Sequence, residues 1–165
     1  MTSSPAARLD EIPGIGPKTA AVIIAEIGIN MTRFPTPGHL ASWARFAPGI
    51  KSSAGKNKGN GSTEHGNRYL ARAIGEAAVA AGRTDTFLGA RYRRIARRRG
   101  KKKAMVALGR SILVIIWHLL ADPDARFNDL GPDHYDRRVS TTAKRRSHIR
   151  GLEALGYTVT IQPAA

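Results

Sequence analysis

The stretch 104–121 constrains the fold more than any other part of the sequence, because it is apolar on nearly every side. An ordinary surface helix keeps one polar face, and this stretch has none. A membrane-spanning helix needs about 20 predominantly apolar residues. This stretch is barely long enough, and Arg110, Ser111 and His118 interrupt it. We therefore expect a buried helix at the centre of a core, and no membrane association.

The rest of the sequence predicts further helices around this one, with end signals at most boundaries. The expected helices are two short ones within 9–28, one opened by Thr36 and Pro37 and ending near Pro48, one at 67–81, one capped by Thr84, and one at 141–155. Residues 29–34 are expected to form a loop, 122–138 an irregular acidic segment, and 157–161 a short strand without a partner. The predicted fold is mostly α, with a small helical bundle, a long basic loop and a C-terminal appendage.

The two short helices meet at a Gly-x-Gly turn that resembles a helix-hairpin-helix motif at 9–28. Gly14 and Gly16 let the backbone turn tightly and approach a ligand, and Pro17 suits the first position of the second helix. Unpaired N–H groups at that helix start, with Lys18 and Thr19 beside them, suit a phosphodiester oxygen. The alternative is a plain glycine-rich connection between two core helices.

Charge points to a polyanionic partner. The chain has 27 Lys and Arg against 12 Asp and Glu, a net charge of +15 and an isoelectric point of about 11.2. Nine of the thirteen residues at 91–103 are basic and none is acidic, so counterions or a phosphate backbone must relieve their repulsion. The alternative is a solvated cationic face. The candidate contacts to nucleic acid in this run are Arg91, Arg94, Arg97, Arg98, Lys101, Lys102 and Lys103.

A candidate nucleophile lies in the expected loop at 49–66, which is rich in glycine, small polar residues and lysine. Ser52 and Ser53 place hydroxyl groups among Lys51, Lys56 and Lys58. A serine there is able to attack a phosphodiester while the lysines offset the developing charge. The alternative is a disordered connection without chemistry. Arg68, just after the loop, is a further candidate contact to DNA.

No metal or disulfide site is expected within the chain. Its acidic and histidine residues are scattered without metal-ligand spacing, and cysteine is absent. Because two-metal chemistry on DNA needs several converging carboxylates, a self-contained metal nuclease is not expected.

Four ordered segments together resemble one protein family. They are 12–28 with the glycine turn, 34–49, 52–78 with the serines, and 97–113 with the basic run. In this order they are similar to the C-terminal domain of the "one-ten" class of bacterial insertion-sequence transposases. The similarity covers about residues 9–121.

The resemblance implies a recombinase that excises and inserts its element. It implies a serine nucleophile, for which Ser53 matches best and Ser52 competes, because Ala54 separates Ser53 from Gly55. It also implies an acidic N-terminal domain that binds a divalent metal, taken as Mg²⁺, an element-encoded guide RNA, and a homo-oligomer. No cofactor is expected in this chain itself.

These inferences give one expectation and one alternative. We expect a transposase C-terminal domain at 8–121 with an extension of uncertain order at 122–165, present as a truncated product, a decayed gene or an excised piece. It would bind DNA in the cytoplasm and be inactive alone, because Met1 stands only a few residues before the glycine turn. The alternative is a non-enzymatic nucleic-acid-binding module.

Overall fold

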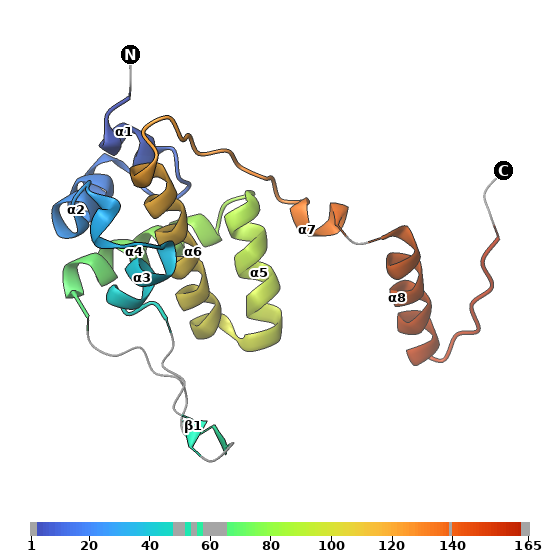
Figure 1. Ribbon diagram of the computed structural model, residues 1–165. Helices are drawn as coiled ribbons and strands as arrows, with labels where there is room; N and C mark the ends of the chain where they lie inside the picture. Colours follow the sequence, from blue (N-terminus) through green and yellow to red (C-terminus); the bar gives the residue numbers. More distant parts are fainter. Residues whose placement is uncertain (1–2, 48–51, 54–55, 58–65, 139, 163–165) are drawn as a thin grey trace. The chain divides into compact units, whose positions relative to one another are not determined.

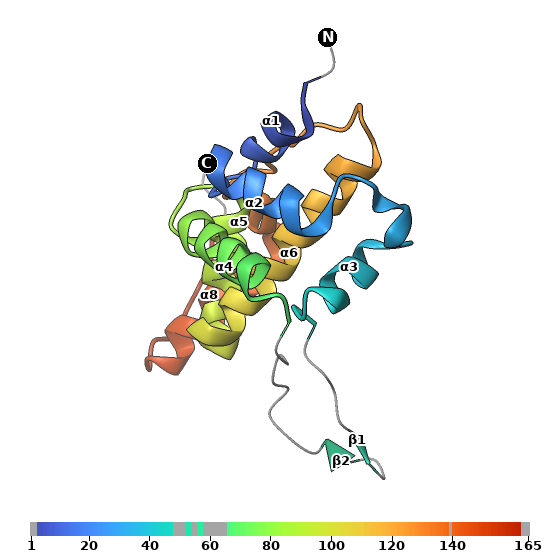
Figure 2. The same ribbon diagram turned by 90° about the vertical axis from the view of Figure 1, so that its left-hand side faces the viewer.

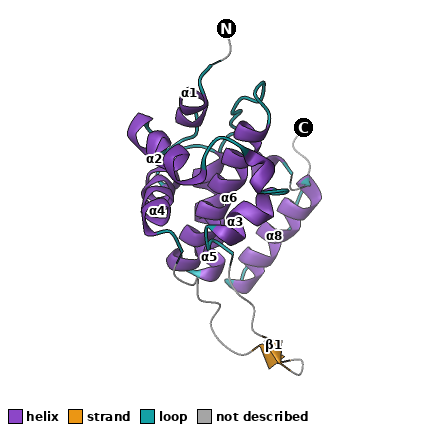
Figure 3. Cartoon of the chain, turned by 60° about the vertical axis from the view of Figure 1, so that its left-hand side comes forward, coloured by secondary structure: helices purple, strands orange, loops and turns teal. Residues whose placement is uncertain are grey.

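The computed structural model describes residues 3–47, 52–53, 56–57, 66–138 and 140–162. These residues are mostly α-helical (Figure 3), which confirms the expected fold class. The chain divides into two compact units, Met1–Pro132 and Asp133–Ala165.

The elements follow one another in a simple order (Figure 1). In the first unit they are α1 (Pro5–Asp10), α2 (Pro17–Ile27), the 3-10 helix η1 (Met31–Arg33), α3 (Pro37–Trp43), β1 (Ser52–Ser53), β2 (Lys56–Asn57), α4 (Arg68–Gly82), α5 (Phe87–Arg99) and α6 (Lys101–Ala121). In the second unit they are α7 (His134–Arg137) and α8 (Thr141–Ala154).

Helix α6 is the centre of the core, as the sequence predicted. It packs against α1, α3, α4 and α5, which surround it in both Figure 1 and Figure 2. By length and composition alone α6 is able to cross a membrane. Its buried residues nevertheless lie against other helices, which makes it a core helix: Ala104, Leu108, Gly109, Ile112, Leu113, Ile116, Leu119 and Leu120. Burying one Leu or Ile side chain stabilises a fold by about 1.5–3 kcal/mol.

Helices α5 and α6 form a hairpin with Gly100 as the single connecting residue. Gly100 ends α5 and also begins α6, with φ +83°. The two helices lie side by side in Figures 1 and 2, and α4 packs against both of them. The lysines at 101–103 therefore belong to the first turn of the core helix, which begins three residues earlier than predicted.

The first helix is attached to the end of the core helix by a buried arginine. Arg8 is 5% exposed. Its Nη1 donates to the backbone oxygens of Leu119 and of Asp122, the latter at 2.8 Å. These carbonyls lie at the C-terminal end of α6, where the last turn lacks helical donors and a positive charge is favoured. Arg8 therefore caps α6 from a distant part of the chain.

The residues just after α6 are held by polar contacts to Glu11, which follows α1, and to the start of α5. Glu11 accepts from the backbone nitrogen of Phe127 at 3.1 Å and pairs with Arg126 at 2.6 Å. Asp129 Oδ1 accepts from the backbone nitrogen of Phe87 at the start of α5, at 3.0 Å. The segment that was expected to be irregular, 122–138, is therefore divided. Its part up to Pro132 belongs to the first compact unit.

Most predicted helix starts are confirmed, and some details are wrong. Thr36 caps α3 and Asn67 caps α4, each with its side-chain oxygen accepting a backbone N–H. The expected loop at 29–34 contains η1, and the expected strand at 157–161 is absent from the described tail. A strand needs a second strand to pair with, and the described part of the chain places none beside these residues.

Candidate nucleic-acid interface

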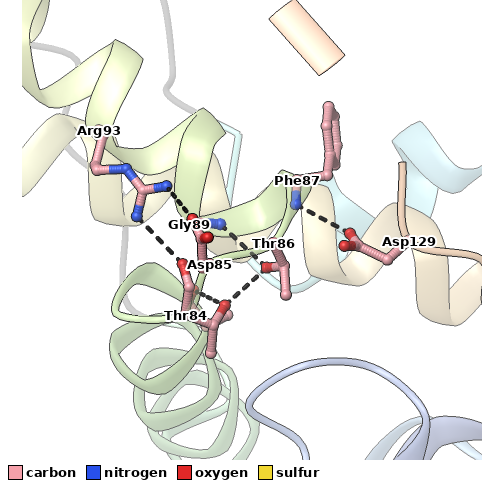
Figure 4. Close-up of polar contacts among 8 residues, drawn as sticks. Thr84, Asp85, Thr86, Phe87, Gly89, Arg93 and Asp129 are labelled. Atoms are coloured by element: carbon pink, nitrogen blue, oxygen red, sulfur yellow. Dashed lines mark hydrogen bonds and ion pairs between the residues drawn. The ribbon is translucent and has the colours of Figure 1, made fainter. Parts of the chain in front are cut away.

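The start of α5 is fixed by a set of polar contacts around Thr86 (Figure 4). The Thr86 hydroxyl accepts from the backbone nitrogen of Gly89 at 3.4 Å. Thr84 is not the cap that the sequence predicted: its hydroxyl donates to the Ala81 carbonyl at 2.8 Å and lies 2.7 Å from the Thr86 hydroxyl. Both threonines have a side chain that is able to cap a helix. Because Thr84 is bonded to the end of α4, Thr86 caps α5. This arrangement sets the direction of the basic helix.

The first half of the basic run is tied to the protein. Arg91 is half-buried, and its Nε donates to the Ser111 hydroxyl at 2.7 Å. Arg93 reaches back to the Thr84 carbonyl at 3.2 Å and to Asp85 at 3.4 Å. The sequence argument that the run has no acid to pair with is therefore wrong for Arg93, whose partner lies eight residues earlier.

The second half of the run is different. Six cations cluster around the turn at Gly100, all of them exposed: Arg97, Arg98, Arg99, Lys101, Lys102 and Lys103. No acidic side chain in the described part of the chain forms an ion pair with them. Like charges this dense repel one another unless counterions or a polyanion neutralise them. Of the candidate contacts, Arg97, Arg98 and the lysines lie together here.

The glycine turn between α1 and α2 has two distinct parts. Gly14 has φ +90°, and a Cβ there would lie 2.4 Å from the backbone oxygen of Ala77 on α4. The backbone approach that the sequence assigned to a ligand is thus made, at Gly14, to a neighbouring helix. Gly16 instead has open space around its Cβ position and starts α2 without a side-chain cap. Only the Gly16 side of the turn faces open space.

Lys18 and Thr19 line a shallow recess between α2 and α4. Its volume is about 310 Å³, and Tyr69, Arg72 and Glu76 line its α4 side. Lys18 is exposed and Thr19 half-buried. The predicted Arg68 lies beside the recess, with its guanidinium carbon 5.2 Å from the centre of the Tyr69 ring. The structure therefore brings Lys18, Thr19 and Arg68 to one surface.

Sequence reasoning missed Arg72 in this recess. Its Nε pairs with Glu76 at 2.8 Å, one helical turn away. The hydrogen bond that Arg72 donates to Glu76, and then the negative charge of Glu76, raise the pKa of Arg72. The signal was present, because Arg72 and Glu76 have the i, i+4 spacing of a helix pair and Arg72 follows Arg68 by one turn. The carboxylate of Glu76 offsets part of the positive charge in this recess.

Both serines lie on one very short strand. Ser52 and Ser53 form β1, which pairs antiparallel with β2 in the register Ser52 to Asn57 and Ser53 to Lys56. Lys51 and Lys58, both predicted contacts, lie outside the described residues, as does most of the expected loop.

Comparison with known proteins identifies the family. The model described as "Transposase IS116/IS110/IS902 family" matches residues 6–93, from α1 into the first half of α5. The chain belongs to this transposase family. A relative from Streptomyces coelicolor, "Insertion element IS110 uncharacterized 43.6 kDa protein", is 38% identical over 116 residues.

The match covers only part of that relative. The aligned region is 69% of this chain but 28% of the relative, so the chain spans a minor part of that protein's length. The family match ends at residue 93, before the six-cation cluster. In this transposase chain, the glycine turn, the recess and the serine strands fall within the family match, and the cluster falls outside it.

Proposed function

We propose that this chain is a DNA-binding, serine-bearing part of an insertion-sequence transposase. The observation that carries the DNA-binding role is the cluster at 97–103, where six exposed cations have no acidic partner among the described residues. Phosphate neutralisation by such a cluster gives affinity without sequence recognition. Membership of the transposase family makes DNA the appropriate polyanion.

The α1–α2 turn serves as a second phosphate contact, in the manner of a helix-hairpin-helix motif. Gly16 leaves the first N–H groups of α2 uncapped and uncrowded. Lys18 and Thr19 add a cation and a hydroxyl beside them. Helix N-termini favour phosphate because their N–H groups and dipole point toward it. Contacts of this type position a duplex and do not read its bases.

Ser53 serves as the nucleophile, with Ser52 as the competing assignment. Its Oγ attacks the phosphorus of a DNA phosphodiester, the Oγ–P bond forms, and the bond from phosphorus to the leaving sugar oxygen breaks. The serine proton passes to a base and a proton is returned to the leaving oxygen. The phosphoserine link keeps the energy of the broken bond for rejoining. Lys56 lies opposite Ser53 in the strand register.

The Mg²⁺ that the family resemblance implies does not fit the residues described here. No group of three or more His, Asp or Glu side chains among them gathers to hold a metal ion. We therefore derive no step through a metal in this chain, and assign metal binding to the remainder of a full-length family member. Oligomer formation and guide-RNA binding belong to the same proposal, as does action in the cytoplasm.

Trapping tests the serine role and separates it from a non-enzymatic binding module. A nicked DNA is incubated with the chain, with and without a full-length homologue, and denaturing gels are searched for a covalent protein–DNA adduct. We expect an adduct with the homologue present, and its loss in Ser53→Ala but not in Ser52→Ala. Loss in Ser52→Ala alone would move the role to Ser52. No adduct in any mixture would refute the nucleophile.

The DNA-binding role is tested separately by salt dependence. The affinity for a random duplex should fall linearly on a log–log plot against salt, with a slope of about −0.9 for each phosphate neutralised. An affinity that did not change with salt would refute phosphate-dominated binding. The serine role would still be decided by the trapping experiment.

A further inference from the structure

The second unit consists mainly of a well-terminated helix. Ser140 caps the start of α8, its hydroxyl accepting from the backbone nitrogen of Ala143 at 3.2 Å. At the other end Gly156 has φ +89°, its N–H bonds to the Glu153 carbonyl at 2.9 Å, and Tyr157 N–H bonds to the Leu152 carbonyl at 3.1 Å. This is the Schellman ending, which glycine favours and which reverses the chain. Helix α8 thus has clear signals at both ends.

The reversed tail partly covers the apolar side of α8. Ile149 and Val159 are the only half-buried residues in 140–162, and the others are exposed. Together with Arg145 and Ile161 they line one recess of about 400 Å³. The tail therefore lies over Ile149, while Leu152 at 43% and Leu155 at 73% remain exposed at the C-terminal end of the helix. A helix that inserts into a lipid surface needs a broad, free apolar face, and α8 does not offer one.

The remaining surface of α8 is cationic. The helix carries Lys144, Arg145, Arg146 and Arg150, and its first acidic residue is Glu153, near its end. Arg146 and Arg150 are exposed and one helical turn apart. None of these cations forms an ion pair within the described part of the chain. Like charges at this spacing destabilise a helix slightly, so a bound anion would relieve their repulsion.

We infer that α8 is a second contact to the DNA backbone, centred on Arg146 and Arg150. The inference rests on the proposed function for its ligand, a DNA duplex, but uses a different unit of the chain. It concerns residues beyond the family match, which ends at residue 93. Phosphates suit this helix because it presents charge without aromatic side chains for base stacking, and its exposed large apolar side chain, Leu152, lies near its C-terminal end.

Linkage makes such a contact effective even where α8 alone binds weakly. Once the first unit holds a duplex, α8 meets the same duplex at an effective concentration in the millimolar range, as for short linkers. Each cation that neutralises a phosphate then adds about 0.9 to the steepness of the salt dependence. The second unit therefore contributes to affinity mainly at low salt.

The experiment compares three forms of the full chain on one duplex over a range of salt. The test variant is Arg146→Gln/Arg150→Gln, because glutamine keeps helix propensity while removing charge. The control is Arg33→Gln/Arg83→Gln, which removes the same charge from two exposed sites outside the proposed surfaces. We expect the test variant to lose about tenfold or more in affinity at low salt, and its slope to fall by about 1.8. The control should change little.

Each other outcome overturns the inference. Equal loss in the test and control variants would mean that net charge alone acts. An unchanged salt slope in the test variant, with wild-type binding still steep, would refute the α8 contact and leave the proposed function intact. The same proteins are added to vesicles of phosphatidylserine and phosphatidylcholine in equal parts. Vesicle binding that Arg146→Gln/Arg150→Gln abolishes, with DNA binding unchanged, would assign α8 to a lipid surface. Circular dichroism checks that α8 remains folded.

Discussion

Both halves of helix α5 carry arginines, but the arginines of the two halves make different contacts. Arg91 and Arg93, in the first half, contact Ser111, Thr84 and Asp85. The arginines at 97–99, in the second half, are exposed and have no ion-pair partner among the described residues. The first group holds the helix in place, and the second is free for a ligand. A run of basic residues is therefore not one functional unit.

The glycine turn also has one residue that contacts the protein, Gly14, and one that faces open space, Gly16. Substitution of Gly14 should have the largest effect of the changes considered, and the effect should be on folding stability. Gly14→Ala would place a Cβ 2.4 Å from the Ala77 oxygen at a φ of +90°. Backbone strain and overpacking together should cost about 3 kcal/mol or more of folding free energy. Gly16→Ala meets no atom within 4 Å and is the matched control. Urea denaturation of both variants measures the difference. Equal stability would place Gly14 outside the core contact described above.

Removing the free half of the basic run should have the next largest effect. Arg97→Gln/Arg98→Gln should weaken duplex binding about tenfold or more at low salt and reduce the salt slope by about 1.8. Folding stability should change by less than about 0.5 kcal/mol, because both side chains are exposed. Fluorescence anisotropy titrations measure the binding, with Arg33→Gln/Arg83→Gln as the charge-matched control. If the control lost as much, the division of α5 into two halves would have no functional meaning.

A substitution in the first half of α5 should have the opposite result: stability should fall and the salt slope of DNA binding should not change. Arg91→Met keeps most of the aliphatic stem but removes the hydrogen bond to Ser111, and should cost about 1 kcal/mol of stability. The salt slope of DNA binding should stay unchanged. Arg110→Met, which removes an exposed cation from α6, is the stability control. A fall in slope for Arg91→Met without a loss of stability would assign Arg91 to the ligand.

The smallest expected effect is a gain of affinity. Glu76→Gln removes the carboxylate that pairs with Arg72 beside Lys18. Because exposed pairs of this kind are worth less than about 1 kcal/mol, the freed guanidinium should tighten duplex binding by about twofold to fivefold. Asp124→Asn makes the same change of charge at an exposed site after α6. If both variants gained equally, the recess would have no special role in binding.

Local patterns predicted the helices better than the partners of their side chains. The continuous apolar pattern of α6, the cap Thr36 and the start of a helix near residue 67 were predicted because each depends on neighbours in sequence. Thr84 and Thr86 have the same chemistry two positions apart, so the choice between them depended on the Ala81 carbonyl of the preceding helix. Propensity alone does not make that choice.

The candidate site was less predictable, since long-range packing decides which groups remain free. The sequence indicates that Gly14 needs a special conformation, but not that the helix lying against it is α4. It indicates that 91–103 is basic, but not that Ser111 of the next helix holds Arg91. The placement of Arg72 beside Lys18 depends on the packing of α2 on α4. These facts come from tertiary structure alone.

The cap that Arg8 places on α6 has a consequence for the order of folding. Arg8 and Leu119 are 111 residues apart in sequence, so closing this contact costs the entropy of a very long loop. Contacts of that kind form after the local helices and hairpins. We expect α1 to dock after the transition state for folding of the first unit. Loss of the Arg8 contact should then speed unfolding and leave the folding rate nearly unchanged.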